Sequence, residues 1–406
     1  MLAATRRLLT QGLPVSGSCY FFQFFYSSSY AYQLSENVFV PNNILQTYNS
    51  LSKEHKIKYC EFDKYKPRFD IIDKDLPQRI KGFNSRMDNI DEVEGGHFED
   101  VFQQFSKATI FMSATDDQIL KERLFDKLFI WASNDALTKT KPCYSSDKQK
   151  NLKSKDCKSM WKDKDGQDLA IKFDDASTLF TILNLNYIYD FYFKRFKIED
   201  NRHKIINKWF KSFYKRIPNQ SINDFYGHQG GWSFPNVFIK HSQHKKYKNN
   251  IKKVLKGMNK ELLKDGSFKD RTTRGNRALH YNNQSLAELF LVIEMAYAAN
   301  LDLPKNMETK LLKAVQIFHE GYLDPMSIEP WAKKKYNSQP SNGNQVFRKI
   351  NRQGYASGWF HIFQVRYPDH EISKWLKKVL VDSSSLKNGL QIGIGIGCIY
   401  NAVANN

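Results

Sequence analysis

The sequence predicts a mostly α-helical protein, and three observations lead to this. Apolar residues recur at intervals of three and four along successive segments, as they do on the buried stripe of an amphipathic helix. The alternation of apolar and polar residues that marks a strand is scarce. Turns or loops separate the helical segments, which suggests helical hairpins stacked into a ring or a solenoid, although no repeat can be read from the residues themselves.

The expected helices begin near residue 118. The first spans residues 118–137, and a polar, Lys-rich stretch at 139–167 follows it as an exposed loop. A second helix starts at Asp174 or Asp175, either of which would cap it. A third, at 205–217, ends before Pro218, because proline removes a backbone donor and breaks a helix. The others are expected at residues 247–263, from near Tyr281 to 301, and at 307–319, 354–365 and 371–381.

The chain divides into three regions. Residues 1–31 have the features of a signal peptide: Arg6 and Arg7, an aromatic apolar run at 19–26, and a small-x-small cleavage site at 29–31. Residues 32–105 are irregular and are expected to wrap the main body, without forming a domain of their own. Residues 106–406 carry the helices of the main domain. We therefore expect an exported protein, periplasmic or secreted, and no stretch is apolar for long enough to span a membrane.

The charge balance favours an anionic partner. Against 42 Asp and Glu there are 62 Lys and Arg, which gives a net charge of +20. Nucleic acid, an anionic membrane and an acidic polysaccharide would all be attracted at long range, so charge alone does not choose among them. The Lys-rich run at 245–253 lies on the polar face of a predicted helix and is expected to be solvated surface.

Four cysteines remain once the predicted leader is removed: Cys60, Cys143, Cys157 and Cys398. An even number in an oxidising compartment indicates disulfides, for which three connectivities are possible. Cys143 and Cys157 flank the polar loop and are a candidate pair. No CxxC or HExxH spacing occurs, so a structural zinc site is not expected.

One segment, residues 265–301, concentrates positive charge at the start of a helix. After an Asp-Gly turn come Arg271, Arg274, Arg277 and His280, and a strongly periodic apolar helix begins near Tyr281. The free amides at a helix N-terminus add partial positive charge to these side chains. Such a place is suited to holding a carboxylate.

The run Arg-Gly-x-Arg-Ala-Leu-His-Tyr, after Asp-Gly-Ser and before an apolar helix, resembles the signature segment of the alginate lyase superfamily of polysaccharide lyases. The resemblance extends from about residue 121 to the C-terminus. It implies an (α/α) toroid with a substrate cleft at one mouth, and cleavage of a uronate polymer such as alginate, polymannuronate or glucuronan. In that family an Arg and a Tyr seven residues apart belong to the catalytic set, and Arg274 and Tyr281 have that spacing.

The resemblance also implies further site residues. The family has an Asn-His pair upstream of the Arg, and this chain has His228 there, preceded by Gly227 in place of the Asn. Gln229 or Asn223 would be the substitute for that Asn, and Trp232 would stack on a sugar face. Arg277 would hold a neighbouring uronate, unless it forms a salt bridge to Glu288 or Asp265. The other residues expected to orient Tyr281 or to line the sugar groove are His280, Asn282, Trp359, Arg366 and Tyr367.

This residue set meets the demands of β-elimination. The carboxylate of a uronate must be neutralised, a base must remove the C5 proton, and an acid must protonate the departing glycosidic oxygen. Arginine stays charged and grips a carboxylate with two parallel hydrogen bonds. Arg274 and His228 are expected to neutralise or position the carboxylate, and Tyr281 is expected to act as base and then as acid. No metal or organic cofactor is required.

Two other functions remain open. A glycoside hydrolase would need two carboxylic acids facing each other across the cleft, for which Asp174, Asp175, Asp265 and Glu288 are available. A non-catalytic protein that binds polyuronate would need neither those acids nor the base. Binding to nucleic acid rests on charge alone, and the predicted export argues against it. The sequence does not indicate the oligomeric state.

Overall fold

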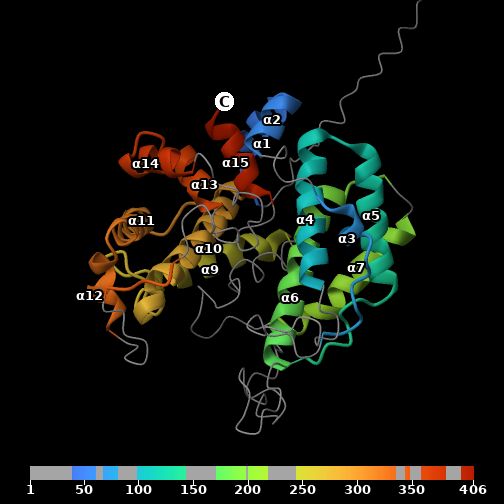
Figure 1. Cartoon of the computed structure of the whole chain (residues 1–406), viewed down its shortest axis with the longest axis horizontal. Coiled ribbons are helices and arrows are strands. Elements are labelled where there is room, and N and C mark those ends of the chain that lie inside the picture. The colour runs from blue at the N-terminus through green and yellow to red at the C-terminus, as the bar shows by residue number, and fades with distance from the viewer. Residues whose placement is uncertain are drawn as a thin grey trace, which may run out of the picture. The chain divides into compact units, whose positions relative to one another are not determined.

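Helices account for nearly all the regular structure of the chain (Figure 1). The computed structural model describes residues 39–60, 67–80, 98–142, 171–197, 200–217, 244–334, 343–347, 358–380 and 395–406. Within these ranges the only β-type pairing is an isolated antiparallel bridge between Leu262 and Phe268. Residues 34–406 form one compact unit, apart from residues 1–33. The expected mostly α-helical class is confirmed.

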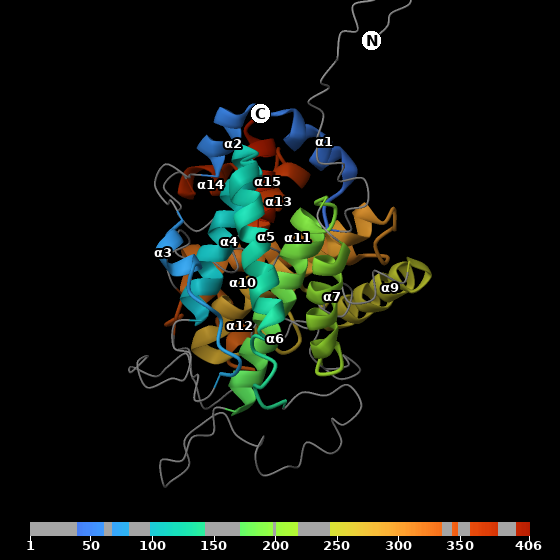
Figure 2. The same cartoon turned by 90° about the vertical axis from the view of Figure 1, so that its right-hand side faces the viewer.

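Four helices of the N-terminal half pack together (Figures 1 and 2). They are α4 (Phe98–Thr115), α5 (Gln118–Ser133), α6 (Ile171–Ile188) and α7 (Asp200–Tyr214). Helix α5 contacts both α4 and α7, and α6 contacts α4 and α7. The Asp117 side chain caps α5 by accepting a hydrogen bond from the Leu120 amide at 2.9 Å, which satisfies one of the free amides of the first turn. The predicted helix at 118–137 is confirmed, although it ends at Ser133.

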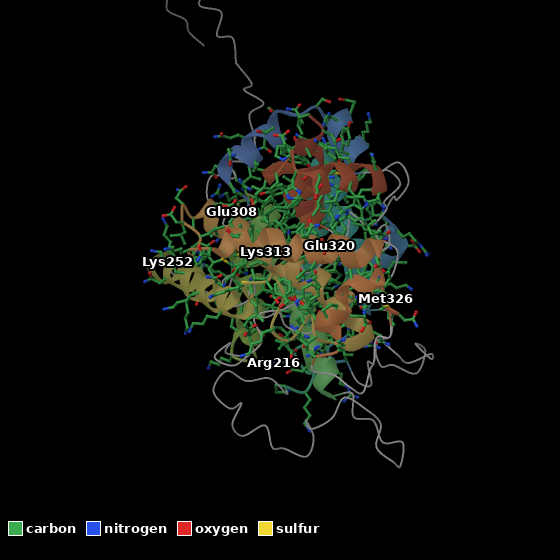
Figure 3. The ribbon with its side chains drawn as sticks, turned by 90° about the vertical axis from the view of Figure 1, so that its left-hand side faces the viewer. Arg216, Lys252, Glu308, Lys313, Glu320 and Met326 are labelled. Carbon is green, nitrogen blue, oxygen red and sulfur yellow. A yellow bond between two sulfur atoms is a disulfide. The ribbon has the colours of Figure 1, made fainter. Side chains whose placement is uncertain are left out.

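The prediction that Asp174 or Asp175 caps a helix is wrong. Helix α6 already includes Ile171, so both residues lie within the helix. Asp175 is fully buried and forms an ion pair with Arg216, which follows α7 and is labelled in Figure 3. A buried carboxylate needs a cation, and here that tertiary contact outweighs the local preference of Asp for a cap. Helix α6 then continues into a π-helical turn, η5 (Tyr189–Phe193).

Helix α10 (Ala278–Ala298) is the centre of the C-terminal half, where it packs on α9 (His244–Glu261), α11 (Met307–Leu323) and α13 (Trp359–Arg366). Every residue from Leu286 to Ala296 on α10 is at most 2% exposed. Two shorter helices, α14 (Glu371–Val379) and α15 (Ile396–Ala404), pack on α13. Between α11 and α13 lie η7 (Pro325–Ile328) and α12 (Glu329–Ala332). The helices predicted at 205–217, 247–263, 281–301, 307–319 and 371–381 are confirmed, with ends shifted by a few residues, whereas the one at 354–365 is described only from Gly358.

The expectation of an irregular chain at 32–105 is wrong for the part of this region that the structure describes. It contains α1 (Asn42–Ser50), α2 (Lys53–Tyr59), α3 (Phe69–Ile72) and the start of α4. Ser52 caps α2 through its side chain, and α1 and α2 both pack against α15 (Figures 1 and 2). The division of the chain into three regions stays a prediction, because its first 38 residues are not described.

The last helix is tied to the N-terminal helices by a disulfide between Cys60 and Cys398. Only one of the three possible connectivities contains this bond, and it is the one that pairs Cys143 with Cys157, which lie outside the described residues. Gly395 precedes α15 with φ of 87°, and a Cβ there would lie 2.5 Å from the Tyr192 hydroxyl. Both the backbone angle and this close approach require glycine at position 395.

Candidate active site

The Asp-Gly turn that opens the site segment is fixed to neighbouring elements. The Asp265 carboxylate accepts hydrogen bonds from Ser267 and, at 3.0 Å, from the Trp331 indole N–H. Burial alone would raise the pKa of Asp265, but these hydrogen bonds outweigh it and hold the pKa below its usual value. Gly266 has φ of 89° and lies so close to α11 that a Cβ would be 2.5 Å from the Lys313 Cβ. The start of the segment is therefore held against α11.

Residues 343–347 hold the N-terminus of α10. The short helix η6 (Gly275–Arg277) leads into α10, and no local side chain caps that start. Instead, the Gln345 side chain accepts a hydrogen bond from the Leu279 amide at 3.0 Å and donates one to the Gly275 carbonyl at 3.1 Å. The Val346 amide donates to the Asn276 carbonyl at 2.6 Å. Sequence reasoning missed Gln345, because the contact spans 66 residues and no local pattern marks it.

Tyr281 lies against two guanidinium groups. The Cζ atom of Arg274 is 4.9 Å from the centre of the Tyr281 ring, and that of Arg271 is 5.4 Å from it. Tyr281 is 6% exposed and Arg271 is 2% exposed. The structure therefore brings together the predicted pair Arg274 and Tyr281, and adds Arg271, which the sequence analysis placed in the cationic segment but not in the catalytic set. A tyrosine enclosed in this way is well placed for an anion to approach.

Arg274 and Arg277 differ in their ionic partners. Arg274 donates to one Asp270 oxygen from Nη2 at 2.6 Å and from Nε at 3.2 Å, and both side chains are about a quarter exposed. Arg277 is half-buried, and it forms no ion pair within the part of the chain that the structure describes. The alternative prediction, a salt bridge from Arg277 to Glu288 or Asp265, is therefore wrong. Asp265 is held by its own turn and by Trp331 instead.

His280 and Asn282 flank the tyrosine on α10. The His280 ring lies 5.2 Å from the Tyr281 ring, edge to face. The Gln284 amide donates to His280 Nε2 at 3.0 Å, which requires that this nitrogen be unprotonated. Asn282 is fully buried, and its side-chain amide makes no hydrogen bond with the described residues. Their predicted contacts with substrate stay predictions.

Trp359, Arg366 and Tyr367 are each held by partners in neighbouring helices, and Trp359 alone of the three is buried. Trp359 is 0% exposed, stacks on a phenylalanine of α10, and donates from its indole N–H to an asparagine of the same helix. Arg366 pairs with the buried Glu294, which at 1.5 Å per residue lies about 20 Å along α10 from Tyr281. The Tyr367 hydroxyl donates to a glutamate of α11 at 2.9 Å. Trp359 is thus bonded to Asn283, two positions after Tyr281, whereas the partners of Arg366 and Tyr367 lie far from it, and the sugar contacts of all three stay predictions.

Three predicted site residues, His228, Gln229 and Trp232, lie outside the described residues, as do Gly227 and Asn223. In the described ranges no three His, Cys, Asp or Glu side chains are grouped so that they could hold a metal ion. No described helix combines the length and the apolar composition that crossing a bilayer requires. The described part of the site is thus a tyrosine, three arginines and a histidine at the start of a buried helix.

These features define a helical protein with a cationic site suited to an anionic ligand. Among solved structures, the chain is similar to a histidine-to-alanine variant of alginate lyase A1-III complexed with a tetrasaccharide. The TM-score is 0.53 and the sequence identity is 13%, and the comparison covers 83% of this chain and 88% of the lyase chain. It is also similar to the tyrosine-to-phenylalanine variant of the same lyase with a tetrasaccharide, with a TM-score of 0.54 and 14% identity. That comparison covers 84% of this chain and 92% of the lyase chain. For the histidine variant without ligand the TM-score is 0.55 and the identity is 14%, and the comparison covers 90% of this chain and 98% of the lyase chain.

The chain therefore has the (α/α) toroid fold of these alginate lyases, and the resemblance to their superfamily is confirmed at the level of the fold. No protein-family model matches the chain, and no curated protein matches its sequence. At 13–14% identity the likeness establishes the architecture, and the chemistry has to be argued from the site.

Proposed function

We propose that this protein is a polysaccharide lyase that cleaves a uronate-containing polymer, alginate or polymannuronate or glucuronan, by β-elimination. The observation that carries the proposal is the pair of guanidiniums against Tyr281, at the start of α10, in a chain with the fold of alginate lyases. A glycoside hydrolase is less well supported. Of its candidate acids, Asp175 is buried in an ion pair with Arg216, and Asp265 is bound within its own turn.

The first step of the reaction is to hold and neutralise the C6 carboxylate of the sugar. Arg277 is suited to this because it has no ion pair within the described part of the chain. Arg274 would join it by exchanging Asp270 for the substrate carboxylate. His228 would help to position the same carboxylate. Neutralising the carboxylate makes the adjacent C5 proton more acidic, which lowers the barrier to its removal.

The second step is the elimination itself. Tyr281, as a phenolate, takes the proton from C5 and becomes a neutral phenol, the bond from C4 to the glycosidic oxygen breaks, and a double bond forms between C4 and C5. The proton then passes from Tyr281 to the departing oxygen, so the enzyme ends in its starting state. Positive charge on Arg271 and Arg274 would stabilise the negative charge that this sequence places on the tyrosine oxygen and the sugar.

We also propose that the protein is exported, with residues 1–31 as a signal peptide, and acts in the periplasm or after secretion. The Cys60–Cys398 disulfide supports this, because disulfides form and persist in oxidising compartments. An extracellular or periplasmic site would also place the protein where acidic polysaccharides are found.

Ultraviolet absorbance tests the reaction, because the C4–C5 double bond of the product conjugates with the carboxylate and absorbs. The purified protein would be incubated with polymannuronate, polyguluronate, glucuronan and an uncharged glucan. New absorbance with an acidic polymer, lowered about 100-fold or more by Tyr281→Phe, is the expected result. The alginate lyase A1-III variant with the same type of substitution was solved with a tetrasaccharide bound, so binding by Tyr281→Phe is expected to persist.

Tyr297→Phe is the matched control. Tyr297 lies on the same helix, and the Arg366 guanidinium is 4.7 Å from its ring centre, so it shares the environment but not the position. Its substitution should leave the absorbance rate unchanged. New reducing ends without absorbance would indicate a hydrolase, and polymer binding with neither product would indicate a non-catalytic binding protein.

A further inference from the structure

Helix α9 presents a line of lysines on the side away from the core. Its apolar residues are buried, and α10 is its main packing partner. Lysines separated by four positions lie one above another on a helix surface, about 6 Å apart along the axis. We call four of them the α9 lysine row: Lys248, Lys252, Lys256 and Lys260. The last three are exposed and the first is half-exposed. Helix α9 extends outward beyond its neighbours in Figures 2 and 3, and Lys252 is labelled in Figure 3.

The α9 lysine row is uniformly cationic, and the one acidic residue of α9 is Glu261 at its end. Residues 247–260 contain no Asp or Glu, and none of the four lysines forms an ion pair with a described residue. Like charges four positions apart destabilise a helix. A solvated helix face ordinarily mixes both signs along such a row. An unbroken cationic row is therefore a cost to folding that an anionic partner would relieve.

A second helix adds positive charge at the C-terminal end of the row. Lys310 of α11 donates to the Asn259 carbonyl and side chain at 2.8 and 3.0 Å, and Lys313 donates to the Lys264 carbonyl at 3.1 Å. Burial, together with the nearby charge of Lys264, lowers the pKa of Lys310. Figure 3 labels Lys313 on α11. Positive charge thus accumulates where the last turn of α9 ends.

The C-terminal end of the row lies toward the candidate active site. Helices α9 and α10 pack on each other and are consecutive, joined by the segment that carries Arg271 and Arg274. The end of α9 and the start of α10 are therefore at the same end of the helix pair. An extended anion held along the row would reach the arginines around Tyr281 without reversing direction.

We propose that the α9 lysine row is a docking surface for a linear polyuronate, which it holds outside the candidate active site and leads toward it. The identity of the polymer rests on the proposed function. A polyuronate carries one carboxylate on every sugar, so a line of flexible point charges matches it without requiring a fixed register. Single-stranded nucleic acid fits less well, because such sites stack bases on exposed aromatic rings, and the aromatic residue on this part of α9, Tyr247, is buried.

The test compares two variants that lose the same charge. One replaces Lys252, Lys256 and Lys260 with glutamine. The control replaces three exposed lysines of α14 with glutamine: Lys374, Lys377 and Lys378. Binding of long polyuronate and of a tetrasaccharide would be measured by calorimetry over a series of salt concentrations, each with Tyr281→Phe added to prevent turnover. Thermal unfolding would confirm that both variants fold.

The expected result is an affinity for long polyuronate about tenfold lower in the α9 variant, with a shallower dependence on salt, and no change in the α14 control. Tetrasaccharide binding should be the same in all proteins. Equal losses in both variants, or no loss in either, would overturn the proposal. Tighter lysine-dependent binding of single-stranded RNA than of polyuronate would overturn the assignment of the partner. If polyuronate binding depends on the row but the protein with Tyr281 intact forms no unsaturated product, the proposed lyase activity fails and the docking surface stands.

Discussion

Replacing Arg366 with alanine should destabilise the protein by about 3 kcal/mol. Its guanidinium donates to both oxygens of Glu294, at 2.8 and 2.5 Å, and Tyr400 donates to the same carboxylate. Glu294 is 0% exposed, whereas the Arg366 side chain is 24% exposed. Removing one partner of a buried ion pair costs about 3–5 kcal/mol, because the other charge is left without compensation. Water reaches part of the guanidinium, so we expect the lower end of that range.

Urea unfolding of Arg366→Ala, Glu294→Gln and the double variant measures this directly. The double variant should lose about 1–2 kcal/mol less than the sum of the single losses, since a neutral amide at 294 no longer needs the cation. Tyr297→Phe, which changes a ring under the same guanidinium without touching the pair, is the control. If Arg366→Ala unfolds at the same urea concentration as the unmodified protein but binds polyuronate more weakly, Arg366 acts on the substrate and the structural reasoning is wrong.

Three further predictions follow from the structure. Gln345→Ala removes the two side-chain hydrogen bonds from Gln345 to the start of α10, so it should cost about 1–2 kcal/mol in urea unfolding and slow the proposed reaction; full activity would contradict this. Cys60→Ser should lower stability by about 2–5 kcal/mol in thermal unfolding, and adding Cys398→Ser to it should have little further effect, because the bond is already lost. Burial lowers the pKa of His361 from 6.5 to about 4. The unfolded chain therefore binds a proton that the folded protein excludes, and about 3 kcal/mol of stability, complete above pH 6.5, should be lost as the pH falls toward 4. His361→Gln should abolish that part of the pH dependence.

Five helices were predictable because each carries its own signal. Helices α5, α7, α9, α11 and α14 have an apolar stripe that faces their neighbours, and the stripe is visible in the sequence. Helices α1, α2, α3 and α15 have between four and nine residues, and isolated helices of that length are marginal in water. Helix α3 packs on α4, whereas α1 and α2 pack on α15, and a disulfide joins Cys60, which follows α2, to Cys398 of α15. Those contacts link opposite ends of the chain, so no local pattern indicates them.

In the candidate site, too, local relations could be predicted from the sequence and distant contacts could not. Arg274 and Tyr281 were found through the resemblance to the alginate lyase signature segment, and the structure joins them locally, because seven positions through η6 and the first turn of α10 bring them together. Gln345 was missed because it reaches the turn from a distant segment. Asp175 was assigned to a helix cap by a local rule, whereas its partner Arg216 lies 41 positions further on. Local spacing predicts which side chains share a turn, and tertiary partners decide what each of them can do.

Two arginines that the sequence placed in one substrate site show why those partners matter. Arg366 and Arg274 each lie over a tyrosine ring at nearly the same distance, 4.7 and 4.9 Å. The acid that binds Arg366 is the fully buried Glu294, so releasing it would leave a carboxylate without solvent or counter-charge, at a cost of about 3–5 kcal/mol. The acid that binds Arg274 is Asp270, four positions away and 27% exposed. An exposed pair at that spacing contributes about 0.3–0.5 kcal/mol, and a half-buried one somewhat more. A substrate carboxylate can displace Asp270 at small cost, whereas Glu294 holds Arg366 in place.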